Sequence, residues 1–214
     1  MDQPIHVFKN DLTAIDSLLK LYNMLAHKNE WDVRQRITGD DNNAVRVSRG
    51  LQKRSIADLT ISKIPSEYYD EVFKYIPEKI LSLGLPKILT FFVSVSGEEI
   101  SPHIDRLRRS ALNIYLSNIN SKTIFYNETQ SETSTELIKY IDREGTVREN
   151  TAKQKWFPEE HNLIQSHVYE PTRGDFAILN VRKPHSVAEI KGDEPRIVLS
   201  IDLPKSFDNY INII

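Results

Sequence analysis

The 214-residue sequence contains no cysteine. This absence excludes disulfide bonds, zinc–thiolate sites and thiol nucleophiles, so any metal ion must be bound by histidine and carboxylate side chains. No apolar run approaches the roughly 20 residues that a helix needs to span a bilayer. The N-terminal residues MDQPIHVFKN also lack the basic and apolar regions of a signal peptide. We therefore expect a soluble, intracellular, cytoplasmic protein with no membrane partner.

An excess of charge of one sign is lacking as well. The 28 Lys and Arg residues nearly balance the 30 Asp and Glu residues, which leaves a formal net charge of -2. Such a balance gives no bulk electrostatic basis for binding nucleic acid or an acidic membrane surface. The length suits one sizeable domain. Because a chain of this size buries roughly 70% of its unfolded surface, a hydrophobic core is expected without covalent cross-links.

Helical periodicity dominates the first 86 residues. In residues 11–28, apolar side chains recur at three- and four-residue spacings, which predicts one amphipathic helix. Residues 66–83 predict further helix, with a break or a restart at Pro77. Between these segments, residues 31–50 predict two short strands around a polar turn.

From residue 87 the periodicity is that of short strands. Apolar and polar residues alternate, and turns that contain glycine or proline separate the strands. This pattern predicts a mainly β protein, a sandwich or jelly roll, with supporting helices. The alternation places Leu112, Ile114 and Leu116 on one face of a strand. We expect the N-terminal helices to cover such apolar faces on the outer side of the sheet.

The expected organisation is a single domain over residues 1–214. Residues 1–86 would form a helical and mixed N-terminal support, residues 87–203 the β core, and residues 204–214 a C-terminal tail. A polar insertion at residues 128–160 interrupts the core, and a hairpin is predicted around the Arg-Glu-Gly sequence in its middle. Long polar insertions in compact domains are usually functional or disordered. This one is therefore a candidate substrate flap or a disordered loop.

The tripeptide His103-Ile104-Asp105 is the first candidate functional motif. On a strand, residues two apart share a face, so His103 and Asp105 can both point at one ion. The motif alone is weak, because six histidines and 30 acidic residues among 214 give about 0.8 His-x-Asp/Glu pairs by chance. With one further histidine, the pair would form the 2-His-1-carboxylate triad of non-haem Fe(II), which leaves positions open for a cosubstrate and oxygen.

Three histidines are candidates for the third ligand: His161, His167 and His185. His161 lies in the polar insertion, and His167 lies at the head of a strand with an ambiguous pattern. His185 follows a proline turn and begins a strand, which places it where the mouth of a jelly roll would be. The alternative for His185 is a surface histidine after a turn.

Arg196 begins the alternating segment RIVLSIDL, so its side chain lies on the face opposite Ile197 and Leu199. An arginine on the inner face of a barrel strand is costly unless it is paired with an anion. On that face it would bind a carboxylate through two parallel hydrogen bonds. The alternative is the solvated face of an edge strand.

Three segments in order, PHID, GDFAILNVRKPHSV and PRIVLSID, resemble the His-x-Asp…His…Arg signature of Fe(II)/2-oxoglutarate-dependent oxygenases. The spacing is similar too: His185 follows His103 by 82 residues, and Arg196 follows His185 by 11. The segments SALNIYLSN and TIFYNE resemble strands of the prolyl-hydroxylase-like and aspartyl/asparaginyl-hydroxylase-like branches. The resemblance covers residues 87–203 and leaves the branch open.

The resemblance implies a double-stranded β-helix (a cupin-like jelly roll) in which His103, Asp105 and His185 bind Fe(II). It implies 2-oxoglutarate and O2 as cosubstrates, hydroxylation of a C–H bond, and release of succinate and carbon dioxide. The distal carboxylate of 2-oxoglutarate would pair with Arg196. The further candidates for the cosubstrate site are Ser200, Tyr115, Asn113 and Tyr126.

The substrate stays open among protein side chains, amino acids, nucleobases and small metabolites, and so does the oligomeric state. The candidates for substrate contact are Arg106, Arg108, Arg109 and Trp156. The alternative for the three arginines is a solvated strand edge, and the alternative for Trp156 is a local packing anchor. Two other functions are also open: a cupin-like metalloenzyme that does not use 2-oxoglutarate, and a non-enzymatic jelly-roll binding module.

Overall fold

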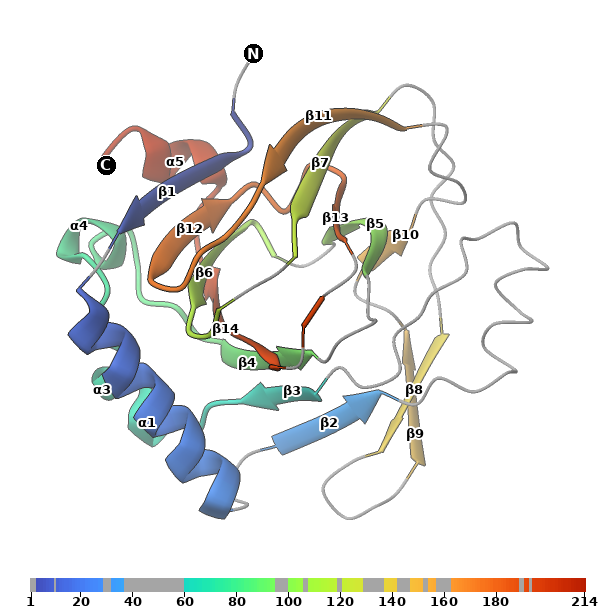
Figure 1. Cartoon of the computed structure of the whole chain (residues 1–214). Helices are drawn as coiled ribbons and strands as arrows, with labels where there is room; N and C mark the ends of the chain where they lie inside the picture. Colours follow the sequence, from blue (N-terminus) through green and yellow to red (C-terminus); the bar gives the residue numbers. More distant parts are fainter. Residues whose placement is uncertain are drawn as a thin grey trace.

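Two antiparallel β-sheets form the centre of the computed structural model, and helices lie along the outside of the larger sheet (Figure 1). The structure describes residues 3–9, 11–28, 32–36, 60–94, 100–105, 108–118, 121–128, 137–141, 147–151, 154–156, 163–188, 191–192 and 194–214.

The helical elements are α1 (Leu12–Lys28), the 3-10 turn η1 (Ser66–Tyr68), α3 (Tyr69–Phe73), α4 (Glu78–Leu81) and α5 (Phe207–Ile211). The strands before the insertion are β1 (Ile5–Lys9), β2 (Asp32–Arg36), β3 (Thr60–Lys63), β4 (Leu89–Ser94), β5 (Ile100–Asp105), β6 (Ser110–Tyr115) and β7 (Thr123–Glu128). The remaining strands are β8 (Leu137–Ile141), β9 (Val147–Thr151), β10 (Gln154–Trp156), β11 (Leu163–Tyr169), β12 (Asp175–Leu179), β13 (His185–Val187) and β14 (Arg196–Leu203).

Eight of these strands form the jelly roll that the sequence predicts. The nine-stranded sheet has the order β1-β12-β6-β14-β4-β3-β2-β8-β9, and the five-stranded sheet has the order β10-β5-β13-β7-β11. From β4 to β7 and from β11 to β14 the chain alternates between the two sheets, which is the topology of a double-stranded β-helix. The inner faces of the sheets meet in one apolar cluster. Its buried members are Ile5, Ala111, Tyr115, Phe125, Ala177, Leu179, Val181 and Val198.

The outer face of the nine-stranded sheet is apolar and is covered by helices, as predicted from the alternation. Leu112, Ile114 and Leu116 share one buried cluster with apolar residues of β4, β12 and β14 and with Leu18 and Leu25 of α1. Val72 of α3, Ile80 of α4 and Tyr210 of α5 complete this cluster. Because the helices satisfy the apolar face, the opposite face of the same strands can carry polar groups toward the interior.

The stretch ISPHIDRLRRSALNIYL is not one continuous strand. It divides into β5, which belongs to the five-stranded sheet, and β6, which belongs to the nine-stranded sheet. The polar residues of the two strands still face one another, because the inner faces of both sheets point into the barrel. Asn113 and Tyr115 therefore lie opposite His103 and Asp105 rather than beside them.

Several local predictions are confirmed or refined. The helix predicted for residues 66–83 is divided into η1, α3 and α4, and α4 begins directly after Pro77. The hairpin predicted in the insertion is formed by β8 and β9, which pair antiparallel next to β2. The polar turn expected at residues 39–43 lies outside the described residues.

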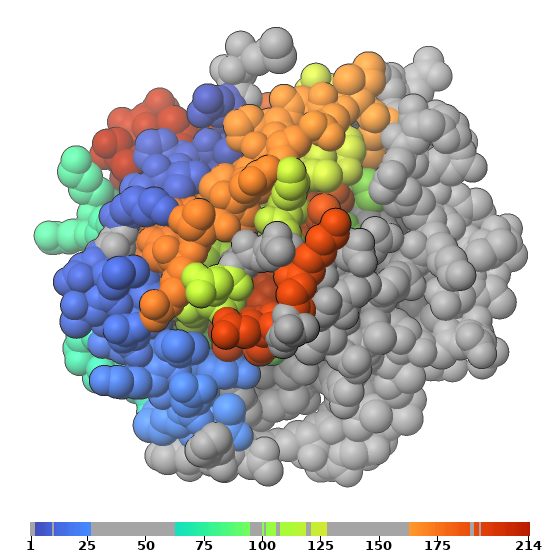
Figure 2. Space-filling model, viewed as in Figure 1, coloured from blue at the N-terminus to red at the C-terminus, as the bar shows by residue number. Residues whose placement is uncertain are grey.

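Two terminal elements lack a clear signal in the sequence. β1 pairs with β12, and the C-terminal tail forms α5, whose Phe207 and Tyr210 are buried. Figure 2 shows β11 (orange) on the surface, between the N-terminal segment (blue) and residues of β7 (yellow-green). Among the described helices, none is both long and apolar enough to cross a bilayer.

Leu18→Ala is expected to destabilise the protein by about 2–5 kcal/mol, because Leu18 is 1% exposed and its removal leaves a cavity between α1 and the sheet. Urea unfolding followed by circular dichroism would measure the change. The matched control is Lys20→Ala on the exposed side of the same helix, for which a change within about 0.5 kcal/mol is expected. Equal effects of the two variants would contradict the packing of α1 on the sheet.

Candidate metal centre

Two neighbouring strands bring His103, Asp105 and His185 together. β13 pairs antiparallel with β5, and His185 lies directly opposite His103 in the register. Residues directly opposite each other on adjacent strands share a face. Asp105, two residues beyond His103, lies on the same face of β5. The strand pairing therefore places two imidazoles and one carboxylate on the inner face of the five-stranded sheet.

The donor atoms of these three residues are close enough to share one ion. One ligand atom from each residue lies within 4.8 Å of the others. His103 Nε2 lies 3.7 Å from Asp105 Oδ1, and the ring centroids of the two histidines are 4.3 Å apart. Two donors that each lie about 2.1 Å from an ion are separated by at most about 4.2 Å, so 3.7 Å suits a shared ion. All three residues are buried.

The imidazole of His185 is held in the form that binds metal. Its Nδ1 lies 2.9 Å from the Lys183 carbonyl oxygen, which can only accept a hydrogen bond. Nδ1 therefore carries the proton, and Nε2 keeps its lone pair. Burial lowers the pKa of His185, although the charge of Asp105 opposes this shift. The neutral imidazole is the form that coordinates a metal ion.

The carboxylate of Asp105 is oriented by an arginine. Its Oδ2 accepts a hydrogen bond from Arg108 Nη1 at 3.3 Å, whereas its Oδ1 is the oxygen nearer to His103. The backbone at Asp105 is fixed as well, because its N–H donates to the Val181 carbonyl at 3.0 Å and its carbonyl accepts from Arg182 Nη1 at 3.2 Å. Two nitrogen donors and one oxygen donor, without thiolate, form the ligand set that suits non-haem Fe(II).

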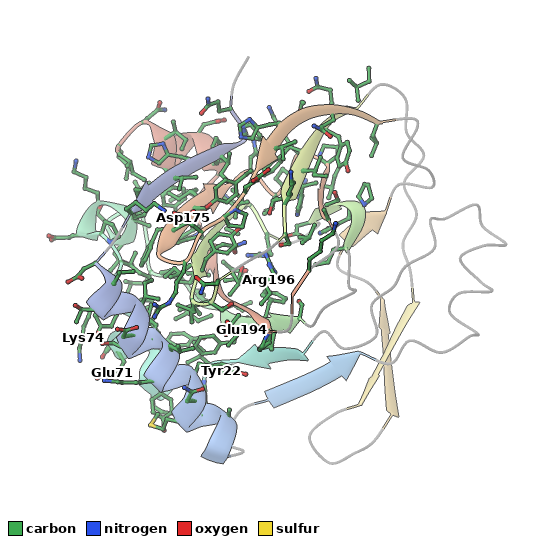
Figure 3. The ribbon with its side chains drawn as sticks, viewed as in Figure 1. Tyr22, Glu71, Lys74, Asp175, Glu194 and Arg196 are labelled. Carbon is green, nitrogen blue, oxygen red and sulfur yellow. The ribbon has the colours of Figure 1, made fainter. Side chains whose placement is uncertain are left out.

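A second group of polar residues lies on the inner face of the nine-stranded sheet. Arg196 begins β14 and is 5% exposed, and Figure 3 shows its side chain directed into the interior. Its guanidinium carbon lies 5.7 Å from the ring centroid of Tyr115 on β6. Ser94 of β4 lies opposite Arg196 in the register, so both side chains share the inner face. We call these three residues the Arg196 cluster.

The Arg196 cluster has hydrogen-bonding capacity that the described part of the chain leaves unused. Arg196 Nε, the Tyr115 hydroxyl and Ser94 Oγ are all buried, and none has a hydrogen-bond partner there. No described carboxylate pairs with Arg196 either. Burial lowers the pKa of Arg196, but an arginine still stays protonated in a protein. A buried cation without an anion is costly, so this cluster suits an anionic ligand.

The buried carboxylate of Asp175 is already compensated by partners other than Arg196. Asp175 accepts hydrogen bonds from the Tyr169 hydroxyl at 2.7 Å and the Thr172 N–H at 2.8 Å, and it pairs with Lys9. The Tyr169 ring meets the Tyr115 ring edge-on at 5.9 Å. Asp175 therefore stabilises the position of Tyr169 next to Tyr115. It does not compensate the charge of Arg196.

The structure places the other predicted cosubstrate residues differently. The Ser200 hydroxyl donates to Asn113 Oδ1 at 2.6 Å and accepts from Arg108 Nη2 at 2.6 Å, so both residues belong to the network around Arg108. Tyr126 alternates with the inward-facing Phe125 on β7 and lies in a separate cluster with Leu163. Its hydroxyl bonds Ser186 at 2.9 Å on that face, so the structure does not bring Tyr126 into the centre.

The predicted substrate residues are only partly described. Arg109 is exposed, whereas Arg108 extends into the interior. Arg106 lies outside the described residues. The backbone of Trp156 lies on β10, directly opposite His103 in the register. Its side chain is outside the described part.

The remaining candidate ligands lie elsewhere. His161 is outside the described residues. His167 lies on β11, and its ring is separated from the triad by Phe125, which contacts His167 at 6.4 Å and His185 at 5.9 Å between ring centroids. Sequence reasoning missed Ser94, because its link to Arg196 is a cross-strand pairing between segments 102 residues apart. The alternation of β4 was its only signal.

Comparisons with known proteins identify the fold. No family model and no curated protein matches the sequence. Two solved structures of the epimerase SnoN are similar, one of them in complex with Fe3+, alpha ketoglutarate and nogalamycin RO. They align over 92% of this chain and over 77% and 76% of their own, with identities of 14% and 12% and TM-scores of 0.56 and 0.51. A prolyl-4-hydroxylase from Pseudomonas putida aligns over 94% of this chain and 92% of its own, at 13% identity and a TM-score of 0.44.

The chain therefore shares the double-stranded β-helix fold of the epimerase SnoN, and His103, Asp105 and His185 form a group on its inner face that could hold a metal ion.

Replacement of either histidine is expected to abolish tight binding of a divalent metal. His103→Ala or His185→Ala removes a direct donor. Loss of an outer-shell partner lowers metal affinity by up to about 100-fold, so the loss of a donor should lower it by more. Calorimetric titration with Mn(II) would measure it. The matched control is His167→Ala, a histidine on the same barrel that lies behind Phe125. Wild-type affinity in both alanine variants would exclude this triad as the metal site.

Proposed function

We propose that the protein is an Fe(II)- and 2-oxoglutarate-dependent oxygenase that hydroxylates a C–H bond and releases succinate and carbon dioxide. The observation that carries the proposal is a pairing of two sites on facing sheets. One sheet presents three buried metal donors, and the other presents a buried arginine without an anionic partner among the described residues. A ligand with a metal-chelating end and a distal carboxylate would satisfy both sites.

The two sites are joined by a short series of aromatic and aliphatic side chains. The Phe125 ring lies 5.9 Å from the His185 ring, and Phe125 shares the interior cluster with Tyr115 and Val198. Tyr115 in turn lies beneath Arg196. These buried side chains would keep water away from the path between the metal and the guanidinium, which strengthens every charged interaction along it.

The roles of the protein residues follow from this arrangement. His103, Asp105 and His185 would hold the iron on one side and leave three of six positions open. Iron and the cosubstrate, when bound, would supply the oxidising chemistry. Arg196 would hold the distal carboxylate through charge-assisted hydrogen bonds, and the hydroxyls of Tyr115 and Ser94 would add neutral ones. In this proposal Ser94 would take the role for which Ser200 was the candidate in the sequence.

The substrate and the part played by the insertion remain predictions. β10 lies beside β5, so the insertion reaches the strand that carries His103 and Asp105. β8 and β9 extend the nine-stranded sheet next to β2 instead. The segment around β10 is thus the part of the insertion that we propose to contact a substrate.

Arg196→Ala is expected to weaken 2-oxoglutarate binding by about 10- to 150-fold, because a hydrogen bond to a charged group contributes about 1.5–3 kcal/mol. Ser94→Ala, which removes one neutral hydroxyl, should weaken it by about fivefold. Anaerobic titration with Fe(II) and then 2-oxoglutarate, followed by the metal-to-ligand charge-transfer band, would give both values. The control is Arg173→Ala, since Arg173 pairs with Asp16 on α1.

The outcomes separate the alternatives. A charge-transfer band in the wild type that weakens in Arg196→Ala would support the oxygenase. Metal binding without a response to 2-oxoglutarate would favour a cupin-like metalloenzyme. Indifference to both ligands would favour a binding module. An unchanged 2-oxoglutarate affinity in Arg196→Ala would remove Arg196 from the site.

A further inference from the structure

Arg108 connects the candidate metal centre to the opposite sheet. It lies in the connection between β5 and β6, and its guanidinium reaches three side chains. Nη1 donates to Asp105 Oδ2 at 3.3 Å, Nη2 donates to the Ser200 hydroxyl at 2.6 Å, and Nε lies 2.6 Å from Asp202 Oδ1. Asp105 belongs to the five-stranded sheet, whereas Ser200 and Asp202 belong to β14 of the nine-stranded sheet.

These contacts fix the direction in which the guanidinium points. Ser200 is itself held, because its hydroxyl donates to Asn113 Oδ1 at 2.6 Å on the neighbouring strand. The Arg108 side chain is 21% exposed, and Ser200 is 2% exposed. Two guanidinium N–H groups are thus directed by hydrogen bonds, one to β5 and one to β14, and Asp202 adds an ion pair from β14. A side chain with this many partners has one favoured orientation.

The orientation of Arg108 divides the two oxygens of Asp105 between two tasks. Oδ2 is occupied by Nη1, and Oδ1 faces His103 Nε2 at 3.7 Å. Because Oδ2 is turned toward Nη1, Oδ1 is the oxygen that faces the ion site. Two-oxygen ligation by Asp105 would fill one of the positions that a triad otherwise leaves free.

Asp202 moderates the effect of the positive charge beside the ligand. A guanidinium that paired with Asp105 alone would draw electron density from the carboxylate and weaken it as a donor. Because Asp202 shares the charge of Arg108, Asp105 retains more negative charge for the metal. Arg108 and its partners therefore set both the direction and the strength of one ligand.

We propose that Arg108 is a positioning residue that holds Asp105 as a one-oxygen ligand and anchors it to β14 through Ser200 and Asp202. This inference rests on the proposed metal centre. It assigns Arg108 a role inside the barrel instead of contact with an acidic substrate. The guanidinium acts through Asp105 and does not itself touch the metal.

Titration of the purified full-length protein with Co(II) alone tests the proposal, because Co(II) reports both affinity and coordination number through its visible absorption. Arg108→Gln is expected to lower the Co(II) affinity by about 10- to 100-fold, as is typical when an outer-shell partner is lost. Its absorption at saturating Co(II) should also differ from the wild type, since Asp105 is then free to bind through both oxygens. Arg108→Lys keeps the positive charge but lacks the planar guanidinium group with its several N–H donors. Its Co(II) affinity should therefore lie between those of Arg108→Gln and the wild type.

Two further variants complete the design. Arg173→Gln is the matched control, because Arg173 is 32% exposed and pairs with Asp16 on α1, on the outer side of the sheet. It should bind Co(II) like the wild type. Asp202→Asn changes a partner of Arg108 and should lower the affinity in the same direction but by less. Circular dichroism and thermal unfolding would verify that each variant is folded.

The results separate the two proposals. Wild-type affinity and absorption in a folded Arg108→Gln protein would overturn the role of Arg108 while leaving the metal centre intact. If Arg108→Gln does not fold, unchanged affinity and absorption in Asp202→Asn would overturn it instead. Absence of Co(II) binding by the wild-type protein would overturn the metal centre itself, and this inference with it.

Discussion

Burial of charge between two sheets is the constraint on which the rest of this structure depends. Asp105 and Arg196 both lie in an interior where an isolated charge is strongly disfavoured. Asp105 is compensated within the chain by Arg108 on one oxygen, and its other oxygen lies 3.7 Å from His103 Nε2. Arg196 has no such partner among the described residues. The first charge is therefore organised for a cation and the second for an anion.

The fold can maintain this polar interior because the apolar outer face of the larger sheet is buried under the helices. α1 and the short helices bury the outer face of the nine-stranded sheet, and this cluster contains most of the large apolar side chains. Stability is thus concentrated on one side of the strands, while the inner side carries the site. The interior is not wholly polar, since Phe125, Tyr115 and Val198 belong to its apolar cluster.

Much of this arrangement could be predicted from local patterns. The alternation around Leu112 and in RIVLSIDL correctly separated the outer apolar face from the inner polar one, because the period of a strand is two residues. The His-x-Asp motif and Arg196 were found in the same way. The division of the segment from His103 to Tyr115 into two strands was not predicted, because the chain crosses between sheets after Asp105. Ser200 was a further candidate for the cosubstrate site; along a strand, its separation of four residues from Arg196 is about 13 Å.

The sequence by itself determined the elements and the faces of their strands, since composition and periodicity act over neighbouring residues. It also supplied the three metal donors and the arginine as candidates. Only the tertiary structure decided which residues meet: His185 opposite His103, Ser94 opposite Arg196, and Arg108 between Asp105 and β14. These contacts join segments far apart in the chain. Strand register and the crossing between two sheets create them, and no local pattern encodes either one.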